Sequence, residues 1–224
     1  MRAARGWHLV TAAISGSSLL LQLVIILARD NDTVLVRLVR LFSFFTIQSN
    51  IIVTVVAVTL FLGPDRDGPV WRIARLASLV CITVTGIVYV TVLRGLYELT
   101  PAERVADTGL HYLTPVLVVV GWVLFGPRPR IGVRTIALTL LFPVLWLGYT
   151  LVRGELTDEY PYPFVDVNAE GYPTVAVNCV LVTALFLAVS GVYRLLDTRL
   201  RAVRSSPAEP ASTLRGHGRS QSSP

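Results

Sequence analysis

The chain alternates between long apolar runs and short polar segments. The runs are about 18 to 25 residues long and consist mainly of Leu, Val, Ile and Ala, while charged residues collect between them. Each run can cross a hydrocarbon core about 30 Å thick as a helix. The pattern therefore predicts an all-α, polytopic membrane protein, a six-transmembrane-helix bundle. The expected spans are approximately residues 7–28, 41–62, 76–93, 110–126, 135–152 and 173–194.

The two ends of the chain differ from the spans in composition. The first run has about 22 apolar residues, whereas the apolar region of a signal peptide has about 7–15, so a retained first helix is predicted. The segment 197–224 is rich in Arg, Ser and Pro and has little to bury, which is typical of a disordered tail. The expected organisation is a transmembrane domain, 1–196, followed by a disordered cytoplasmic tail, 197–224.

Composition supports the membrane class. Hydrophobic residues make up 53% of the 224 and charged residues 15%, against roughly 25% charged in soluble domains. The net charge of +6 would suggest nucleic acid in a soluble protein, but here the arginines flank spans, so we expect membrane lipids as partners and no nucleic acid. No Cys/His spacing is typical of a metal site, and neither a metal nor a cofactor is expected.

Arginine supplies every basic side chain, since the chain contains no lysine. This excludes a retinal Schiff base and a lysine nucleophile. Of the 20 basic residues, 14 lie in the N-terminus, the second and fourth connections and the tail. Because cytoplasmic segments are enriched in basic residues, both termini are predicted to be cytoplasmic. The arginine-only usage is typical of a GC-rich bacterial genome, so the expected location is the bacterial cytoplasmic membrane.

Polar side chains interrupt the second run in the segment FFTIQSNIIV, residues 44–53. Thr46 and Asn50 are four residues apart and share a helix face, while Gln48 points elsewhere. In the predicted topology most other intramembrane polar groups also lie in the outer half. Such groups can serve as interhelical hydrogen bonds, but clustering in five helices predicts a pocket open toward the outer leaflet. The substrate-binding candidates are Asn50, Gln48, Tyr89, Tyr149 and Asn178.

The fourth span contains the one histidine of the apolar region, His111. A capping box in the sequence TPAE starts this helix near Pro101, which puts His111 about 15 Å along the axis. Pro115 removes the helical partner of the His111 carbonyl and should bend the helix there. At that depth His111 can take the hydroxyl proton of Thr46. Thr46 and His111 are therefore the candidate catalytic pair, and Asn50 can orient them or donate to an oxyanion.

The connection before the last span, residues 153–172, has two prolines, a third directly after it at residue 173, and several acids, and it cannot cross the membrane as a helix. Its aromatic residues suit either a lid over the pocket mouth or an anchor at the membrane interface. Both interpretations stay open.

These features resemble a known family. The Phe-Phe-Thr of residues 44–46, the histidine near a proline in the fourth span, and the Tyr-Pro-Phe of residues 162–164 look like the androgen-induced and androgen-dependent membrane proteins. The resemblance implies a threonine hydrolase that cleaves fatty acid esters of hydroxy fatty acids, with Thr46 and His111 as its catalytic pair. Residues 47–50, Ile-Gln-Ser-Asn, are more polar than in the animal proteins, and the spacing from His111 to Pro115 is shorter, as expected of a bacterial branch.

A second function remains open from the same residues. An outer polar cluster can bind a lipid or a small molecule without chemistry, as in a carrier or sensor. A secondary transporter is disfavoured, because the chain shows no inverted repeat and no acid is evident inside the spans.

Overall fold

A computed structural model of the protein describes residues 2–128 and 130–200. Within them it contains helices and no strand, in agreement with the predicted all-α class. In chain order the elements are α1 (Arg2–Ala28), α2 (Val34–Ser43), α3 (Phe45–Leu62), α4 (Pro69–Val88), η1 (Tyr89–Leu93), α5 (Pro101–Thr108), η2 (Gly109–Leu113), α6 (Thr114–Phe125), α7 (Val133–Thr157), η3 (Pro163–Val165) and α8 (Val167–Arg199).

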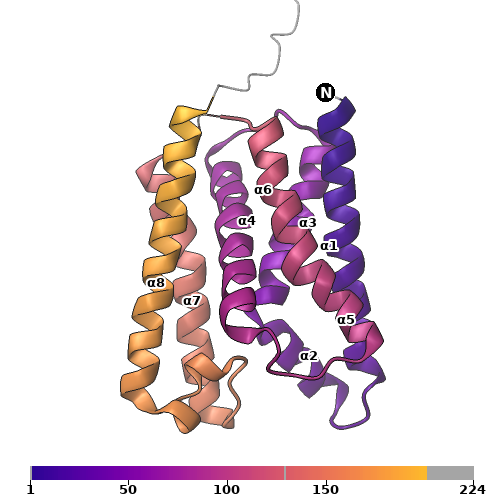
Figure 1. The fold of residues 1–224 in the computed structure, drawn as a ribbon, viewed down its shortest axis with the longest axis vertical. Coiled ribbons are helices and arrows are strands. Elements are labelled where there is room, and N and C mark those ends of the chain that lie inside the picture. Colours follow the sequence, from indigo (N-terminus) through magenta and orange to yellow (C-terminus); the bar gives the residue numbers. More distant parts are fainter. Residues whose placement is uncertain (1, 129, 201–224) are drawn as a thin grey trace, which may run out of the picture.

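Six helical segments in the described residues are long and apolar enough to cross a membrane, which confirms the predicted number of spans. Four spans are the single helices α1, α3, α7 and α8. One span joins α4 and η1, and another joins α5, η2 and α6. The start of α1 and the end of α8 lie at the same end of the bundle (Figure 1), as six crossings require. The side of the membrane that this end faces stays a prediction from the arginine distribution.

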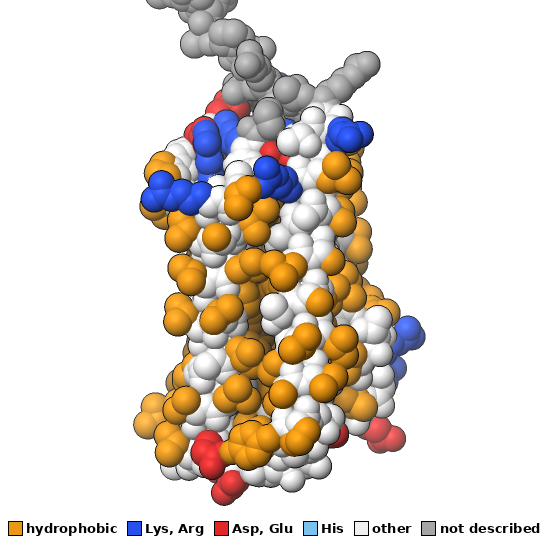
Figure 2. Space-filling view, turned by 90° about the vertical axis from the view of Figure 1, so that its left-hand side faces the viewer, with side chains coloured by type: hydrophobic (Ala, Val, Ile, Leu, Met, Phe, Trp, Pro, Cys, Tyr) orange, Lys and Arg blue, Asp and Glu red, His pale blue; other side chains and the backbone are white. Residues whose placement is uncertain are grey.

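The outer surface of the bundle is suited to lipid. Large apolar side chains such as Leu20, Val55 and Val180 are more than half exposed. Figure 2 shows such side chains along the flank formed by α7 and α8, with most of the visible arginines at the end where the chain starts and acids at both ends. Since hydrocarbon replaces water around these helices, their exposure is favourable.

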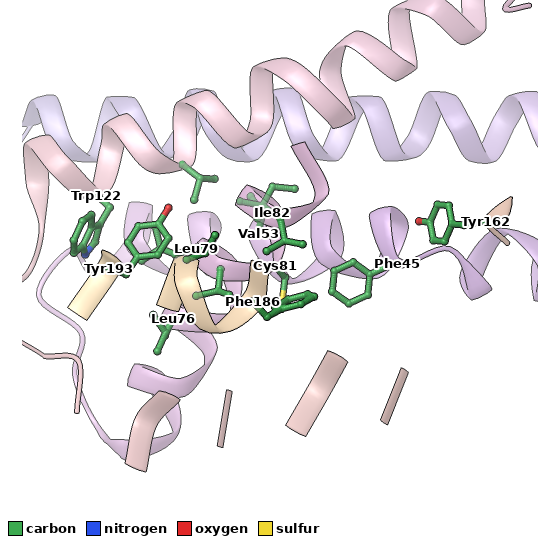
Figure 3. Close-up of a cluster of buried hydrophobic side chains, with 14 of the residues drawn as sticks. Phe45, Val53, Leu76, Leu79, Cys81, Ile82, Trp122, Tyr162, Phe186 and Tyr193 are labelled. Atoms are coloured by element: carbon green, nitrogen blue, oxygen red, sulfur yellow. The ribbon is translucent and has the colours of Figure 1, made fainter. Parts of the chain in front are cut away.

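The core surrounds α4, which contacts α3, α6, α7 and α8. Buried side chains form a column along the bundle (Figure 3), with Trp122 and Tyr193 at one end and Tyr162 at the other. Between them, Phe45 packs edge-to-face on Phe186 with ring centroids 5.8 Å apart. Polar side chains gather at both ends of this column, near Tyr162 at one end and near Trp122 at the other.

Two features differ from the sequence expectations. Helix α2 is a short amphipathic helix that precedes the second span, whereas no helix was expected before residue 41; Thr33 caps its first turn. Helix α8 continues to Arg199, so Asp197 is helical and 1% exposed rather than part of a tail. Its Oδ2 accepts hydrogen bonds from the backbone N–H groups of Arg130 (2.6 Å) and Ile131 (2.7 Å). The rest of the predicted tail, 201–224, lies outside the described residues.

Candidate active site

The side chains of Thr46 and His111 lie in contact. Thr46 Oγ1 is 3.2 Å from His111 Nε2, although the two residues come from different spans. Thr46 is 6% exposed. A hydroxyl and an imidazole at hydrogen-bond distance are the arrangement that activates a hydroxyl as a nucleophile.

Thr46 lies in the first turn of α3 because the chain breaks between α2 and α3. Phe44 at the break has an extended backbone, φ −70° and ψ 128°. The break is stabilised from α7, where the Trp146 indole N–H donates to the Ser43 carbonyl at 2.9 Å. Tyr149 shares a 2.9 Å hydrogen bond with the Ser43 hydroxyl. The backbone N–H groups of a first helical turn have no partner within the helix and carry partial positive charge, so negative charge beside Thr46 is stabilised.

His111 lies within a π-helical turn, η2, in the middle of the fourth span. Pro115 has no N–H for the His111 carbonyl. At the start of the same turn, the Thr114 hydroxyl donates to the Gly109 carbonyl at 2.8 Å. Gly86 of α4 lets the two helices approach, since a Cβ there would lie 3.2 Å from the Pro115 ring. The predicted irregularity at His111 is therefore present as a π-turn, a feature common at functional sites.

Asp107 lies on the far side of the imidazole. The Asp107 Oδ1 atom is 2.8 Å from His111 Nδ1, although it lies off the line of the ring N–H. The Asp107 Oδ2 atom accepts a hydrogen bond from the Tyr89 hydroxyl at 2.6 Å. Tyr89 also stacks on His111, with ring centroids 3.9 Å apart. A carboxylate can only accept, so this contact favours a proton on Nδ1 and leaves Nε2 to accept the Thr46 hydroxyl. The sequence interpretation missed Asp107, although its i, i+4 spacing to His111 was a readable signal.

Tyr162 completes the surroundings of Thr46. Its hydroxyl lies 3.2 Å from Thr46 Oγ1 and accepts from the Thr46 backbone N–H at 3.1 Å. Burial raises the pKa of Tyr162, so the phenol stays protonated and can donate. The connection before α8 thus folds inward at Tyr162, whose ring stacks on Phe164 at 5.3 Å.

An apolar cavity of about 140 Å³ opens beside Thr46. It lies between α3, α4, α7 and α8, and Thr46, Thr85 and Tyr162 are among its few polar side chains. A separate polar cleft of about 920 Å³ lies across η1 and is bordered by Tyr89 and Asp107. The Thr46–His111 contact is therefore flanked by an apolar hollow on one side and a polar cleft on the other.

None of the five predicted substrate-binding side chains lines the apolar cavity, whereas Tyr89 borders the polar cleft. Asn50 is fully buried and donates to the carbonyls of Thr46 (2.9 Å) and Leu110 (3.4 Å). Gln48 donates to the Phe42 carbonyl at the end of α2 at 2.7 Å. Asn178 donates to the Phe164 carbonyl at 3.0 Å. Tyr149 shares a hydrogen bond with the Ser43 hydroxyl, and Tyr89 donates to Asp107. The five side chains therefore support the helices around Thr46 and the imidazole of His111.

The expectation that the spans contain no acids is wrong. Asp107 belongs to the fourth span and Asp197 to the sixth, so the spans do contain acids. Both carboxylates accept hydrogen bonds from the protein. Among the residues described, no three His, Cys, Asp or Glu side chains converge as metal ligands would.

Fold and composition together define a polytopic integral membrane protein. No family model, curated protein or solved structure matches the chain. The function is therefore inferred from the geometry of the site itself.

Proposed function

We propose that the protein is a hydrolase of fatty acid esters that works within the membrane, with Thr46 as nucleophile and His111 as general base. The observation that carries the proposal is the 3.2 Å contact between Thr46 Oγ1 and His111 Nε2, with Asp107 on the opposite ring nitrogen. The short resemblance to the androgen-induced and androgen-dependent family supports the same pair of residues.

The first half-reaction follows from these positions. Thr46 Oγ1 attacks the ester carbonyl carbon while His111 Nε2 takes the hydroxyl proton. The Thr46 backbone N–H and the Tyr162 hydroxyl bond each other at 3.1 Å in the free protein, and once that bond parts both can donate to the developing oxyanion. The tetrahedral intermediate then breaks its bond to the leaving oxygen, which takes the proton from His111 and departs as an alcohol. The acyl group remains on Thr46.

The second half-reaction uses water. His111 takes a proton from a water that attacks the acyl-threonine carbonyl, and the intermediate expels Thr46 Oγ1, which recovers its proton from His111. The products are a free acid and the original enzyme. The polar cleft bordered by Asp107 and Tyr89 gives water a route toward the imidazole.

The apolar cavity supports an acyl chain as the group held beside Thr46. Its walls come from side chains such as Val88, Leu147 and Phe186, which offer dispersion contacts and no hydrogen bonds. An alkyl chain is the part of an ester that suits such walls.

The test is covalent labelling of the purified protein with a fluorophosphonate probe of hydroxyl nucleophiles. Wild type is expected to be labelled, and Thr46→Ala and His111→Ala are expected to lose the label. Thr59→Ala is the matched control, because Thr59 lies on the same helix and its hydroxyl donates to the Val55 and Val56 carbonyls of that helix. Labelling that survives in Thr46→Ala contradicts the proposal.

A lipid-binding protein without catalysis is the second candidate. It is favoured by the position of the Tyr162 hydroxyl, which already bonds the backbone N–H and the side-chain hydroxyl of Thr46. Tight retention of a fatty acid ester, without labelling and without cleavage, would support this function over the hydrolase.

A further inference from the structure

The apolar cavity beside Thr46 has a closed side and an open side. Its inner wall consists of core residues, among them Val84, which is 2% exposed, and Phe186, which is 7% exposed. Its outer wall includes Val144 of α7, which is 62% exposed, and Leu187 of α8, which is 54% exposed. Because these two side chains line the cavity and also reach the surface of the bundle, the cavity opens between α7 and α8. This is the flank that faces the viewer in Figure 2.

The mouth of the cavity lies at the level of the hydrocarbon core of a membrane. Thr183, which also lines the cavity, is the central residue of α8 (Val167–Arg199), and Val144 lies beside the centre of α7 (Val133–Thr157). Both helices are long and apolar enough to cross a membrane, so their exposed central residues face acyl chains. The Thr183 hydroxyl donates to the Cys179 carbonyl of its own helix at 2.7 Å. This hydroxyl is therefore satisfied within α8, and the mouth can border hydrocarbon.

The cavity is too small for a complete long acyl chain. Its volume is about 140 Å³, and an engineered cavity of about 150 Å³ in another protein holds one benzene molecule. With an ester carbonyl at Thr46, the cavity therefore accommodates about six carbons of the chain. A palmitoyl chain has to continue outside the cavity, and the mouth between α7 and α8 gives it a way into the surrounding lipid.

We infer that the protein, if it is the proposed hydrolase, takes esters of long linear fatty acids sideways from the bilayer and leaves the distal part of the acyl chain in the lipid. The first carbons of the chain occupy the cavity beside Thr46, and the remainder passes between α7 and α8. Thr183 and Leu187 lie one helical turn apart on one face of α8. Together with Val144 of α7 they form the mouth, and their size determines which chains can pass.

The test compares hydrolysis of p-nitrophenyl butyrate and p-nitrophenyl palmitate by the full chain in nanodiscs. Leu187→Trp and Thr183→Trp each place an indole in the mouth, and both positions are exposed, so neither substitution needs room in the core. The indole and a long chain compete for the same space, whereas a butyryl group fits inside the cavity. In both variants kcat/KM should fall at least about tenfold for the palmitate and stay within about twofold of wild type for the butyrate.

Leu181→Trp is the matched control. Leu181 is an exposed leucine of the same helix, 62% exposed, and does not line the cavity. This variant makes the same substitution on the lipid-facing surface of α8 away from the mouth. It should keep the wild-type ratio of palmitate to butyrate hydrolysis.

The path of the chain can also be mapped without turnover in Thr46→Ala, which leaves the ester intact. Palmitoyl esters carry a photoreactive diazirine either near the carbonyl or near the methyl end. The first probe should crosslink to inner-wall residues such as Val84 and Phe186, and the second should crosslink to nanodisc lipids. Both results together support an exit between α7 and α8.

The outcomes separate the inference from the proposed function. If wild type cleaves neither ester, the hydrolase is contradicted, while the crosslinks still report the path of the chain. If wild type cleaves both esters but both mouth variants behave like Leu181→Trp, the exit path alone is overturned. An equal loss of butyrate and palmitate cleavage in both mouth variants overturns it too, as do methyl-end crosslinks confined to the inner wall.

Discussion

The two polar regions of this bundle differ in how their charges are satisfied. At the Thr46 site a continuous chain of contacts runs from Tyr162 through Thr46, His111 and Asp107 to Tyr89. At the opposite end of the bundle, the Arg75 guanidinium and the Asp197 carboxylate each keep buried atoms without a partner among the described residues. The imidazole lies between a hydroxyl and a carboxylate, and this placement suits proton transfer, although the Nδ1 atom makes no aligned hydrogen bond to Asp107.

Asp107→Asn should give the largest effect on hydrolysis, apart from removal of Thr46 or His111 themselves. The amide can donate to Nδ1 and so favours a proton on Nε2, where a base is needed. We expect kcat to fall about 10²–10⁴-fold, with KM for the ester little changed. Steady-state hydrolysis of a long-chain ester in detergent measures both constants.

The control for Asp107 is Asp30→Asn, an exposed acid in the first connection, which should leave kcat unchanged. A rise in KM at constant kcat in Asp107→Asn would mean that Asp107 acts in substrate binding and does not act through His111.

Tyr162→Phe should have the next largest effect. The phenol is one of two donors beside the expected oxyanion, and loss of a single such donor costs about 10²-fold in kcat. Tyr160→Phe is a close control, because the Tyr160 hydroxyl has no partner in the described residues. The two variants are compared under single-turnover conditions; equal rates would remove Tyr162 from the mechanism.

Asn50→Ala tests structural bracing rather than chemistry. Asn50 joins α3 to the Leu110 carbonyl and accepts from Ser15 of α1 at 3.2 Å, so its loss leaves buried groups unpaired. We expect a loss of about 1–2 kcal/mol in the free energy of unfolding, measured by denaturant titration in mixed micelles. Gln48→Ala, at a partly exposed position, should cost less. The reverse order would contradict the structural role given to Asn50.

The smallest effect concerns pH and the ion pairs of Glu159. Hydrogen bonds from Arg40, and secondarily from Arg153, lower the pKa of Glu159 from 4.5 to about 2. A lowered pKa stabilises the fold fully above pH 4.5, and this contribution is lost as the pH falls from 4.5 toward 2. Wild type should therefore lose more thermal stability than Glu159→Gln across this interval. Parallel stability curves for the two proteins would argue against the ion pairs.

The sequence predicted the features that depend on local pattern. The six spans follow from the length of the apolar runs, and the equal depth of Thr46 and His111 follows from the helical rise. The break at Phe44 was missed because Trp146 and Tyr149, about a hundred positions away, stabilise it. The buried Asp197 was missed because a short Arg-rich sequence reads as a tail unless its backbone partners at residues 130 and 131 are known.

The central claim, that Thr46 forms the covalent acyl intermediate, is tested most directly by trapping that intermediate. The protein is mixed with a long-chain ester, quenched in acid and digested, and its peptides are analysed by mass spectrometry. We predict one acyl group on Thr46 in wild type, and none in Thr46→Ala. Ester hydrolysis without acylation of Thr46, or with acylation at another residue, would contradict the account.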